Sequence, residues 1–441
     1  MSEPTAGSAP VLDYNNPNTF AGMTRYRWVI CALLFYATTL NYMDRSILNV
    51  LAPTLQKALH YSDAQYGYIG TAFSAAYALG FLLMGWLIDR VGTRAGYAIS
   101  LMLWTAAGAS TALVTSTLGL AIARSFLALG EAGNFPAAIK TVAEWFPQRD
   151  RAHATGIFNS GSNIGAILAP LLVPFVIFHF GSWQAAFLIT PTFAVVWIGL
   201  WLYIYRSPHQ HPRCNSAERD YINCDGVQAP RAKVKWRQIL PHRQTWAIMV
   251  GKFLTDPIWW FYLFWSGKFI ADKFHVQMKG LALPLIVIYV LASFGSLAGG
   301  WLSSTLIRSG WTPNAARKTA MFACALAVAP VSVAPIMPSM WPAVFLIAIA
   351  AAAHQGFSAN IFTLTSDMFE KAAVGSVVGL AGLCGGLGSI LLQFSAGKIV
   401  QASGSYLKVF IIAAAVYMLA VVMIQVLAPK LTPVDLNASG D

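Results

Sequence analysis

The chain has 441 residues, of which 57% are hydrophobic and only 10% are charged, against about 25% charged residues in a typical soluble domain. A soluble protein of this size could not bury so much apolar surface, so the composition predicts a protein embedded in a lipid bilayer. The net charge of +12 is spread over short segments between apolar runs, without the basic patch that a nucleic acid would need. We therefore expect no nucleic-acid partner.

The first half of the chain contains six apolar segments behind a polar start. Residues 1–24 are rich in Ser, Pro, Asn and Thr, which predicts a disordered cytoplasmic tail. No cleaved signal peptide is expected, because no charged region with a short apolar core and a cleavage site precedes the first long apolar run. A helix needs about 20 residues to cross the hydrocarbon core. Residues 25–205 are predicted to form a six-helix bundle with helices at 27–51, 65–88, 95–115, 117–140, 153–179 and 183–205.

A polar linker at 206–243 separates this bundle from a second one at 244–428, and a cytoplasmic tail is expected at 429–441. The fold class predicted is an all-α membrane protein with twelve transmembrane helices in two pseudo-symmetric halves. Most Lys and Arg fall on one side if the N-terminus is inside, so both termini are expected in the cytoplasm. The helices of the second bundle are predicted at 245–270, 281–307, 317–337, 341–366, 374–398 and 405–428.

Two cysteines of the linker, Cys214 and Cys224, lie near His209 and His211. A zinc site is one interpretation, but the spacing matches no strong zinc-binding pattern. We therefore expect reduced thiols without a metal, and no cofactor elsewhere in the chain.

The loop between the second and third predicted helices reads GWLIDRVGTR (85–94), and the loop between the eighth and ninth begins GWLSSTLIRSG (300–310). The similarity indicates an internal repeat. Because each half has an even number of helices, the two halves should be related by an axis normal to the membrane.

The segment at 85–94 is similar to the loop signature G-x-x-x-D-[RK]-x-G-x-[RK] of the major facilitator superfamily, and the resemblance covers residues 25–428. Its glycines permit close helix approach and a tight turn, its aspartate can cap a helix end, and its arginines can stay in the headgroup region. We interpret the motif as a structural gating latch rather than a substrate contact. Its residues are Gly85, Asp89, Arg90, Gly92 and Arg94.

Ionisable residues lie within the apolar runs, where they are costly and are candidates for function. The first helix contains Asp44 and Arg45, the fourth contains Arg124 and Glu131, and Lys252 lies at membrane depth in the seventh. One interpretation is two ion pairs that tie helices together. The other is an anion site with titratable carboxylates, in which all four groups of the first and fourth helices converge on one cavity. Since buried ion pairs often fail to repay their desolvation, we favour the second.

Two arginines at one depth suit a substrate that carries a carboxylate, because the planar guanidinium binds carboxylate through two hydrogen bonds. Substrate that occupies an arginine favours protonation of a neighbouring acid, so that proton and anion help each other bind. Sodium would need several neutral oxygens together with a carboxylate around one ion. No such cluster is evident, so the proton is the expected coupling ion.

Polar residues of the fifth and tenth helices are candidates for binding substrate hydroxyls, and the aromatic run at 252–265 in the seventh helix offers rings that stack on a sugar. The alternative for the Ser and Thr residues is hydrogen bonding between helices, and for the rings a place in the core or the interfacial belt. The candidates are Asn159, Ser162, Asn163, Trp259, His354, Gln355 and Asn360.

Four segments narrow the resemblance to the hexuronate transporters of the anion:cation symporter family. They are NYMDRS (41–46), FNSGSNIGA (158–166), FLTDPIWWFYLFW (253–265) and HQGFSANIFTLTSDMF (354–369). Residues 266–268 depart from the family, since they read Ser-Gly-Lys where Leu-Pro-Lys is common. Galactonate-type relatives have Gln at the position of Ser162, which favours a hexuronate.

The resemblance implies proton-driven import of galacturonate or glucuronate across a bacterial inner membrane. It assigns proton coupling to the acidic groups, anion binding to the arginines and a place near the pocket to two tyrosines. The residues concerned are Asp44 and Glu131, Arg45 and Arg124, and Tyr42 and Tyr77.

The sequence thus predicts a monomeric symporter that imports a small organic anion with protons by alternating access. The same fold could instead carry an aldonate, an aldarate or an aromatic acid. A sugar-acid sensor should have a sizeable cytoplasmic output domain, whereas the linker has fewer than 40 residues. An enzyme is not expected, because no nucleophile–base pair or metal cluster stands out.

Overall fold

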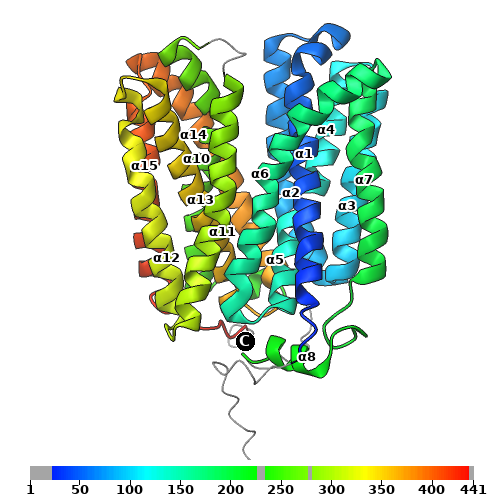
Figure 1. Cartoon of the computed structure of the whole chain (residues 1–441), viewed down its shortest axis with the longest axis vertical. Coiled ribbons are helices and arrows are strands. Elements are labelled where there is room, and N and C mark those ends of the chain that lie inside the picture. Colours follow the sequence, from blue (N-terminus) through cyan, green and yellow to red (C-terminus); the bar gives the residue numbers. More distant parts are fainter. Residues whose placement is uncertain (1–21, 226–233, 277–280, 437–441) are drawn as a thin grey trace, which may run out of the picture.

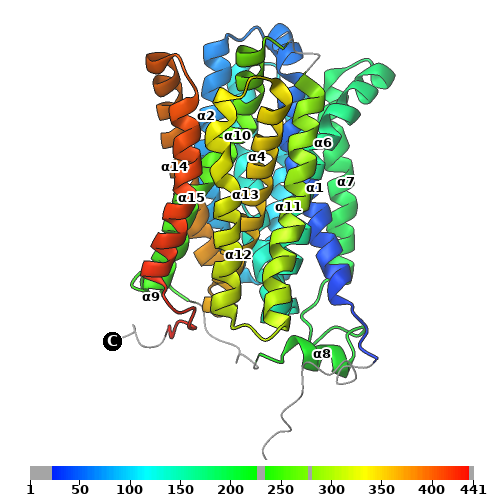
Figure 2. The ribbon, with the colours of Figure 1, turned by 60° about the vertical axis from the view of Figure 1, so that its left-hand side comes forward.

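The computed structural model describes residues 22–225, 234–276 and 281–436, and within these ranges the chain forms helices and no β-strand. Figures 1 and 2 show two helical bundles side by side, one from each half of the sequence. The tail predicted at 1–24 falls almost wholly outside the described residues. Figure 1 also shows that the helix α8 lies beyond one end of the first bundle, and we refer to this end of the molecule as the α8 end.

The first bundle makes six crossings, with α4 and α5 forming one crossing together. Its helices are α1 (Arg27–Leu59), α2 (Asp63–Val91), α3 (Thr93–Ser110), α4 (Thr117–Glu131), α5 (Asn134–Trp145), α6 (Gln148–Phe180) and α7 (Trp183–Ile204). Two short helices follow in the linker, α8 (Ser216–Ile222) and α9 (Trp236–Ile239).

The second bundle also makes six crossings, with α12 continued by the 3-10 helix η3. Its helices are α10 (Arg243–Phe274), α11 (Ala282–Arg308), α12 (Pro313–Val328), η3 (Ala329–Ile336), α13 (Met340–Met368), α14 (Val374–Ser403) and α15 (Leu407–Leu427). Among the described residues, 8 helical segments are long enough and apolar enough, by length and composition alone, to cross a membrane. The other crossings are α1, α3, α4 with α5, and α10, which gives the twelve expected in two halves.

The segment predicted as one helix at 117–140 is interrupted after Glu131. Pro136 has no N–H group to donate to a carbonyl one turn earlier, so the helix cannot continue regularly through this point. Side chains from neighbouring helices supply donors to the carbonyls at the break. Ser100 Oγ donates to Gly130 O at 2.7 Å, and Asn41 Nδ2 donates to Glu131 O at 3.1 Å. The backbone of Glu131 is therefore bound to α1 at the break.

The two bundles approach each other closely where α6 meets α11 near the α8 end. A Cβ atom at Gly156 would lie 2.4 Å from Ser296 O, and one at Gly300 would lie 2.2 Å from Ala152 O. Any side chain at these positions would force the helices apart, so glycine is required for this contact.

The linker helix α8 is fixed to the start of α1. Its fully buried Glu218 accepts hydrogen bonds from Tyr26 N at 2.8 Å and Arg27 N at 3.0 Å, and it pairs with Arg27 Nη1 at 3.2 Å. These are free N–H groups of the first helical turn, where a negative charge is favourable. The linker thus caps the first membrane-crossing helix.

Candidate functional site

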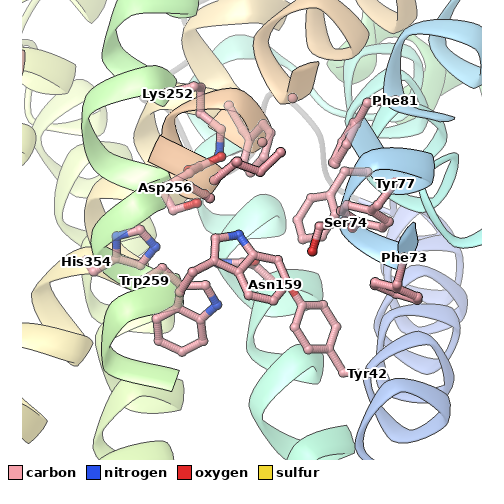
Figure 3. A pocket seen from close by; sticks show the side chains of 18 of the residues that line it. Tyr42, Phe73, Ser74, Tyr77, Phe81, Asn159, Lys252, Asp256, Trp259 and His354 are labelled. Atoms are coloured by element: carbon pink, nitrogen blue, oxygen red, sulfur yellow. The ribbon is translucent and has the colours of Figure 1, made fainter. Parts of the chain in front are cut away.

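A cavity of about 660 Å³ lies between the two bundles. Its walls come from α1, α2, α5 and α6 of the first half and from α10, α13 and α14 of the second. Figure 3 shows aromatic side chains on one wall, with a lysine, an aspartate and a histidine on the opposite side.

The aromatic wall contains Tyr42, Phe73, Tyr77 and Trp260. The guanidinium carbon of Arg45 lies 4.8, 5.4, 4.4 and 5.5 Å from the centroids of these four rings, in the same order. Arg45 does not itself line the cavity and is buried against the rings that do. The face of an aromatic ring attracts a cation, so the wall holds this charge close to the cavity without exposing it.

Arg45 is paired with Glu131. Its Nη2 and Nε atoms lie 3.0 and 3.3 Å from Glu131 Oε2. Among the described residues, neither Arg45 Nη1 nor Glu131 Oε1 has a hydrogen-bond partner, although both atoms are buried. Arg45 Nη1 can therefore still donate a hydrogen bond and Glu131 Oε1 can still accept one, which is unusual for buried polar atoms.

The second predicted arginine, Arg124, also lies against the aromatic wall. Its guanidinium carbon is 5.2 Å from the ring centroid of Phe73, which Arg45 contacts as well. The structure therefore brings both arginines to one aromatic side chain, although Arg124 does not line the cavity.

Asp44 lies near Glu131 and Arg124 but binds a different helix. Its Oδ1 accepts a hydrogen bond from Thr190 of α7, and a Cβ atom at Gly108 of α3 would lie 3.8 Å from it. Successive residues of a helix point about 100° apart, so Asp44 faces the interior of the first bundle while Arg45 faces the aromatic wall. None of the four ionisable groups lines the cavity, so the expectation that they converge on it is wrong. Arg45 and Arg124 lie behind the aromatic wall, and Asp44 faces the interior of the first bundle.

The predicted polar residues of α6 and α13 form a chain of hydrogen bonds between the two halves. Asn159 Nδ2 donates to Gln355 Oε1 at 2.8 Å and to Ser296 Oγ at 3.1 Å. Gln355 Nε2 donates to Asn163 Oδ1 at 3.4 Å. Asn159 and Gln355 line the cavity, whereas Asn163 is buried behind them.

His354 and Trp259 form a stacked pair on the opposite wall. Their ring centroids are 5.2 Å apart with an interplanar angle of 9°, and His354 Nδ1 lies 2.6 Å from the hydroxyl of Tyr417. Both members of the pair line the cavity. They present a flat surface of the kind that packs on a sugar ring.

Two predicted hydroxyl ligands lie elsewhere. Ser162 Oγ donates to Asn159 O at 2.7 Å, and Asn360 Nδ2 donates to Gly299 O and Gly356 O at 2.9 Å each. Neither residue lines the cavity. Both side chains bind backbone carbonyls, Ser162 within α6 and Asn360 partly across to α11, so neither is placed to bind substrate hydroxyls.

The cavity contains an ion pair that the sequence-based site omitted. Lys252 Nζ lies 2.6 Å from Asp256 Oδ1, and both residues line the cavity. Lys252 Nζ also lies 3.9 Å from the ring centroid of Phe362. The available signal was the spacing, since a lysine and an aspartate four residues apart in one apolar run share a helix face.

A stacked aromatic pair joins the halves beside Lys252. Phe135 of α5 and Phe362 of α13 have centroids 5.1 Å apart at an interplanar angle of 19°, and both rings line the cavity. Because α13 ends at the α8 end, the pair forms the cavity wall on that side.

The motif at 85–94 connects the two halves at the α8 end. Asp89 accepts hydrogen bonds from Gly375 N at 3.1 Å and Ser376 N at 2.6 Å, at the start of α14, and it pairs with Lys140 at 2.7 Å. A Cβ atom at Gly85 would lie 2.3 Å from Gly375 O. Asp89 therefore caps a helix of the opposite half, and Gly85 permits the approach.

The other motif residues stay within the first half. The guanidinium carbon of Arg90 lies 5.0 Å from the ring centroid of Trp86, and Arg94 donates to Leu202 O. Gly92 has a φ of 89°, a value that favours glycine at the turn into α3.

Further ion pairs join the halves at the same end. Asp367 of α13 pairs with Arg151 of α6 at 3.3 Å and, within its own half, with Arg317 of α12 at 3.0 Å. Asp150 of α6 pairs with Arg308 of α11 at 2.6 Å. The α8 end is thus held closed by charged contacts, whereas in Figure 1 the ribbons of the two halves diverge toward the other end.

The linker cysteines Cys214 and Cys224 are free thiols. Within the part of the chain that the structure describes, no group of three or more His, Cys, Asp or Glu side chains is placed to hold a metal ion.

Comparison with known sequences gives a consistent result. The sequence profile of the Major Facilitator Superfamily matches residues 34–388. The hexuronate transporter of Escherichia coli (strain K12) is 34% identical over 385 residues, which cover 86% of this chain and 88% of that protein. The galacturonate transporter of Dickeya chrysanthemi is 39% identical over 281 residues, which cover 63% of this chain and 81% of that protein.

Comparison with solved structures supports the same fold. The proton:xylose symporter XylE bound to 6-bromo-6-deoxy-D-glucose matches with a TM-score of 0.74, covering 95% of this chain and 99% of that one. Sequence identity is 14%, so this likeness concerns the fold alone.

Proposed function

Because this chain belongs to the major facilitator superfamily, we propose that it is a proton-coupled symporter that imports a hexuronate such as galacturonate or glucuronate. The predicted superfamily and the prediction of a transporter rather than an enzyme are confirmed by the profile and by relatives that are transporters. The names of two similar bacterial proteins support a hexuronate as the substrate.

The observation that carries the proposal is the ion pair of Arg45 and Glu131 behind the aromatic wall. A proton on Glu131 removes the negative partner of Arg45, and the guanidinium then favours the carboxylate of the substrate. Binding of the anion in turn favours the protonated acid, so each ligand raises the affinity for the other. Arg124, on the same phenylalanine, adds positive potential to this wall.

The remaining cavity residues suit a sugar ring with several hydroxyls. The stacked pair of Trp259 and His354 can pack on the ring face. Asn159 and Gln355 can exchange their mutual hydrogen bond for bonds to substrate hydroxyls. Since one of these amides belongs to each half, the substrate would contact both halves at once.

Alternating access follows from the charged contacts at the α8 end. With this end in the cytoplasm, as the distribution of Lys and Arg predicts, the cavity is closed toward the inside. The loaded protein would break the contacts of Asp89 with α14 and of Asp367 with Arg151, and open inward. We place the protein in a bacterial inner membrane, with both termini inside, and propose that it acts as a monomer.

A second proton is assigned to Asp44, in the interior of the first bundle. One proton with a monoanion moves no net charge, whereas two protons would let the membrane potential drive uptake. Moving one elementary charge across 100 mV supplies about 2.3 kcal/mol.

The proposal is tested by uptake of labelled galacturonate and glucuronate into proteoliposomes that contain the purified protein. We expect uptake that an acidic exterior stimulates and that both unlabelled hexuronates inhibit. If neither labelled hexuronate is taken up while a labelled aldonate, aldarate or aromatic acid is, the substrate assignment is wrong. Binding without uptake would instead indicate a sensor.

A further inference from the structure

Lys252 is the only Lys or Arg among the described residues that line the cavity. Its side chain is 4% exposed, and it lies on α10, in the half opposite to the arginines that the sequence singled out. Figure 3 shows Lys252 and Asp256 across the cavity from Phe73 and Tyr77.

Unlike Lys252, Arg45 does not line the cavity. Four aromatic rings lie between 4.4 and 5.5 Å from its guanidinium carbon, and Glu131 already neutralises it. An anion inside the cavity can therefore contact Lys252 directly, whereas Arg45 lies behind the rings.

The partner of Lys252 is an acid that a substrate carboxylate can replace. The pair with Asp256 has a separation of 2.6 Å, and the aspartate side chain is 19% exposed. Exchanging one carboxylate for another keeps the lysine paired throughout, and the displaced carboxylate of Asp256, which is partly exposed, turns to the cavity.

The position of Lys252 also connects the anion to the contact between the halves. Its ammonium group lies 3.9 Å from the centroid of Phe362, which stacks on Phe135 of the other half. A lysine drawn toward a substrate would move off this ring and weaken a cation–π contact at the inner wall.

We infer that Lys252 binds the substrate carboxylate in this conformation, in exchange for Asp256, and that it sets the preference for an acidic sugar over a neutral one. The inference rests on the proposed function and deepens it. Transfer of the carboxylate to Arg45 follows when Glu131 is protonated, so Lys252 governs affinity and Glu131 governs coupling.

The test compares Lys252→Gln with the wild type in galacturonate uptake by proteoliposomes. Loss of a charge-assisted contact should raise KM about tenfold or more, while kcat changes less. Discrimination between galacturonate and its uncharged methyl ester, measured as inhibition of uptake, should fall by a similar factor. Lys252→Arg should restore much of both.

The same helix offers a matched control. Lys268 pairs with Asp272 at 3.0 Å, also four residues apart, but both side chains are largely exposed and lie outside the cavity. Lys268→Gln should leave KM and the discrimination unchanged. Asp256→Asn should lower KM for galacturonate several-fold, because it removes the competitor for Lys252, and a misfolded variant would not show this gain.

The outcomes separate the two claims. If the wild type takes up no hexuronate, the proposed function is contradicted and the inference falls with it. If the wild type does so and Lys252→Gln keeps its KM and its discrimination, the inference alone is contradicted. A shift of similar size in Lys268→Gln would also contradict it.

Discussion

Arg45 Nη2 lies 3.0 Å from Glu131 Oε2, and the guanidinium group is at the same time enclosed by aromatic rings that line the cavity. The acid is held at a break between α4 and α5, where Asn41 binds its carbonyl oxygen. A cation, an acid and a cavity wall thus meet at one position. We propose that proton binding and anion binding are coupled at this position.

Arg45→Lys tests whether the shape of the guanidinium matters there. A lysine keeps the charge but cannot place two N–H groups on Glu131 Oε2 or stack flat on the rings. We expect KM for galacturonate to rise about tenfold or more, measured in proteoliposomes. Arg206→Lys is the control, since Arg206 is exposed and lies outside both the cavity and the gating motif. An unchanged KM in Arg45→Lys would argue against carboxylate binding at this residue.

Asp89→Asn should shift the protein toward the state that is open at the α8 end. It weakens the pairing with Lys140 and the cap on α14, interactions worth about 1.5–3 kcal/mol each when charged. The readout is labelling of Ser389→Cys, in the cavity, by an impermeant maleimide from the opposite side, in a variant without native cysteines. We expect labelling to slow several-fold. Unchanged or faster labelling would contradict the role of Asp89 as a latch.

Glu218→Ala should release the linker from the start of α1. Burial, with the nearby carboxylate of Glu218, raises the pKa of the Cys214 thiol to about 11, so roughly one thiol in 10,000 is ionised at pH 7. The thiolate is the reactive form, so maleimide labelling should be slow at pH 7 and rise with pH. Removing Glu218 exposes Cys214 and removes the charge, and labelling at pH 7 should therefore accelerate.

The labelling is measured in inside-out vesicles, with Cys214→Ser as the control for other cysteines. Fast labelling of Cys214 in the wild type, or no change in Glu218→Ala, would show that the contacts of Glu218 do not protect the linker. Labelling of Cys214 in right-side-out vesicles would contradict the proposed orientation.

The sequence predicted the fold well because apolar length and the distribution of charge act locally along the chain. It did not predict the break at residues 132–133, although Pro136 is a clear signal for it. The reason is that the flanking residues are apolar enough for one continuous span. A hydropathy pattern measures depth in the membrane and carries little information on backbone geometry.

The candidate site was predicted less completely than the fold. Arg45, Glu131, Asn159, Gln355 and His354 were identified because polar groups stand out in apolar runs. Which face each one takes depends on helix rotation, which the sequence constrains weakly. Asp44 therefore turned out to face α7, and Asn360 to serve backbone carbonyls. The pair of Lys252 and Asp256 was overlooked because its charges cancel within one helix turn.

The most direct test of the account replaces Glu131 by Gln and compares two modes of galacturonate transport in the same proteoliposomes. Glu131→Gln removes the proton site but still leaves Arg45 without a negative partner, so exchange of external for internal substrate should continue. Accumulation driven by an imposed pH gradient should be lost. If this variant still accumulates galacturonate in response to the gradient, the proton is coupled elsewhere and the central claim is wrong.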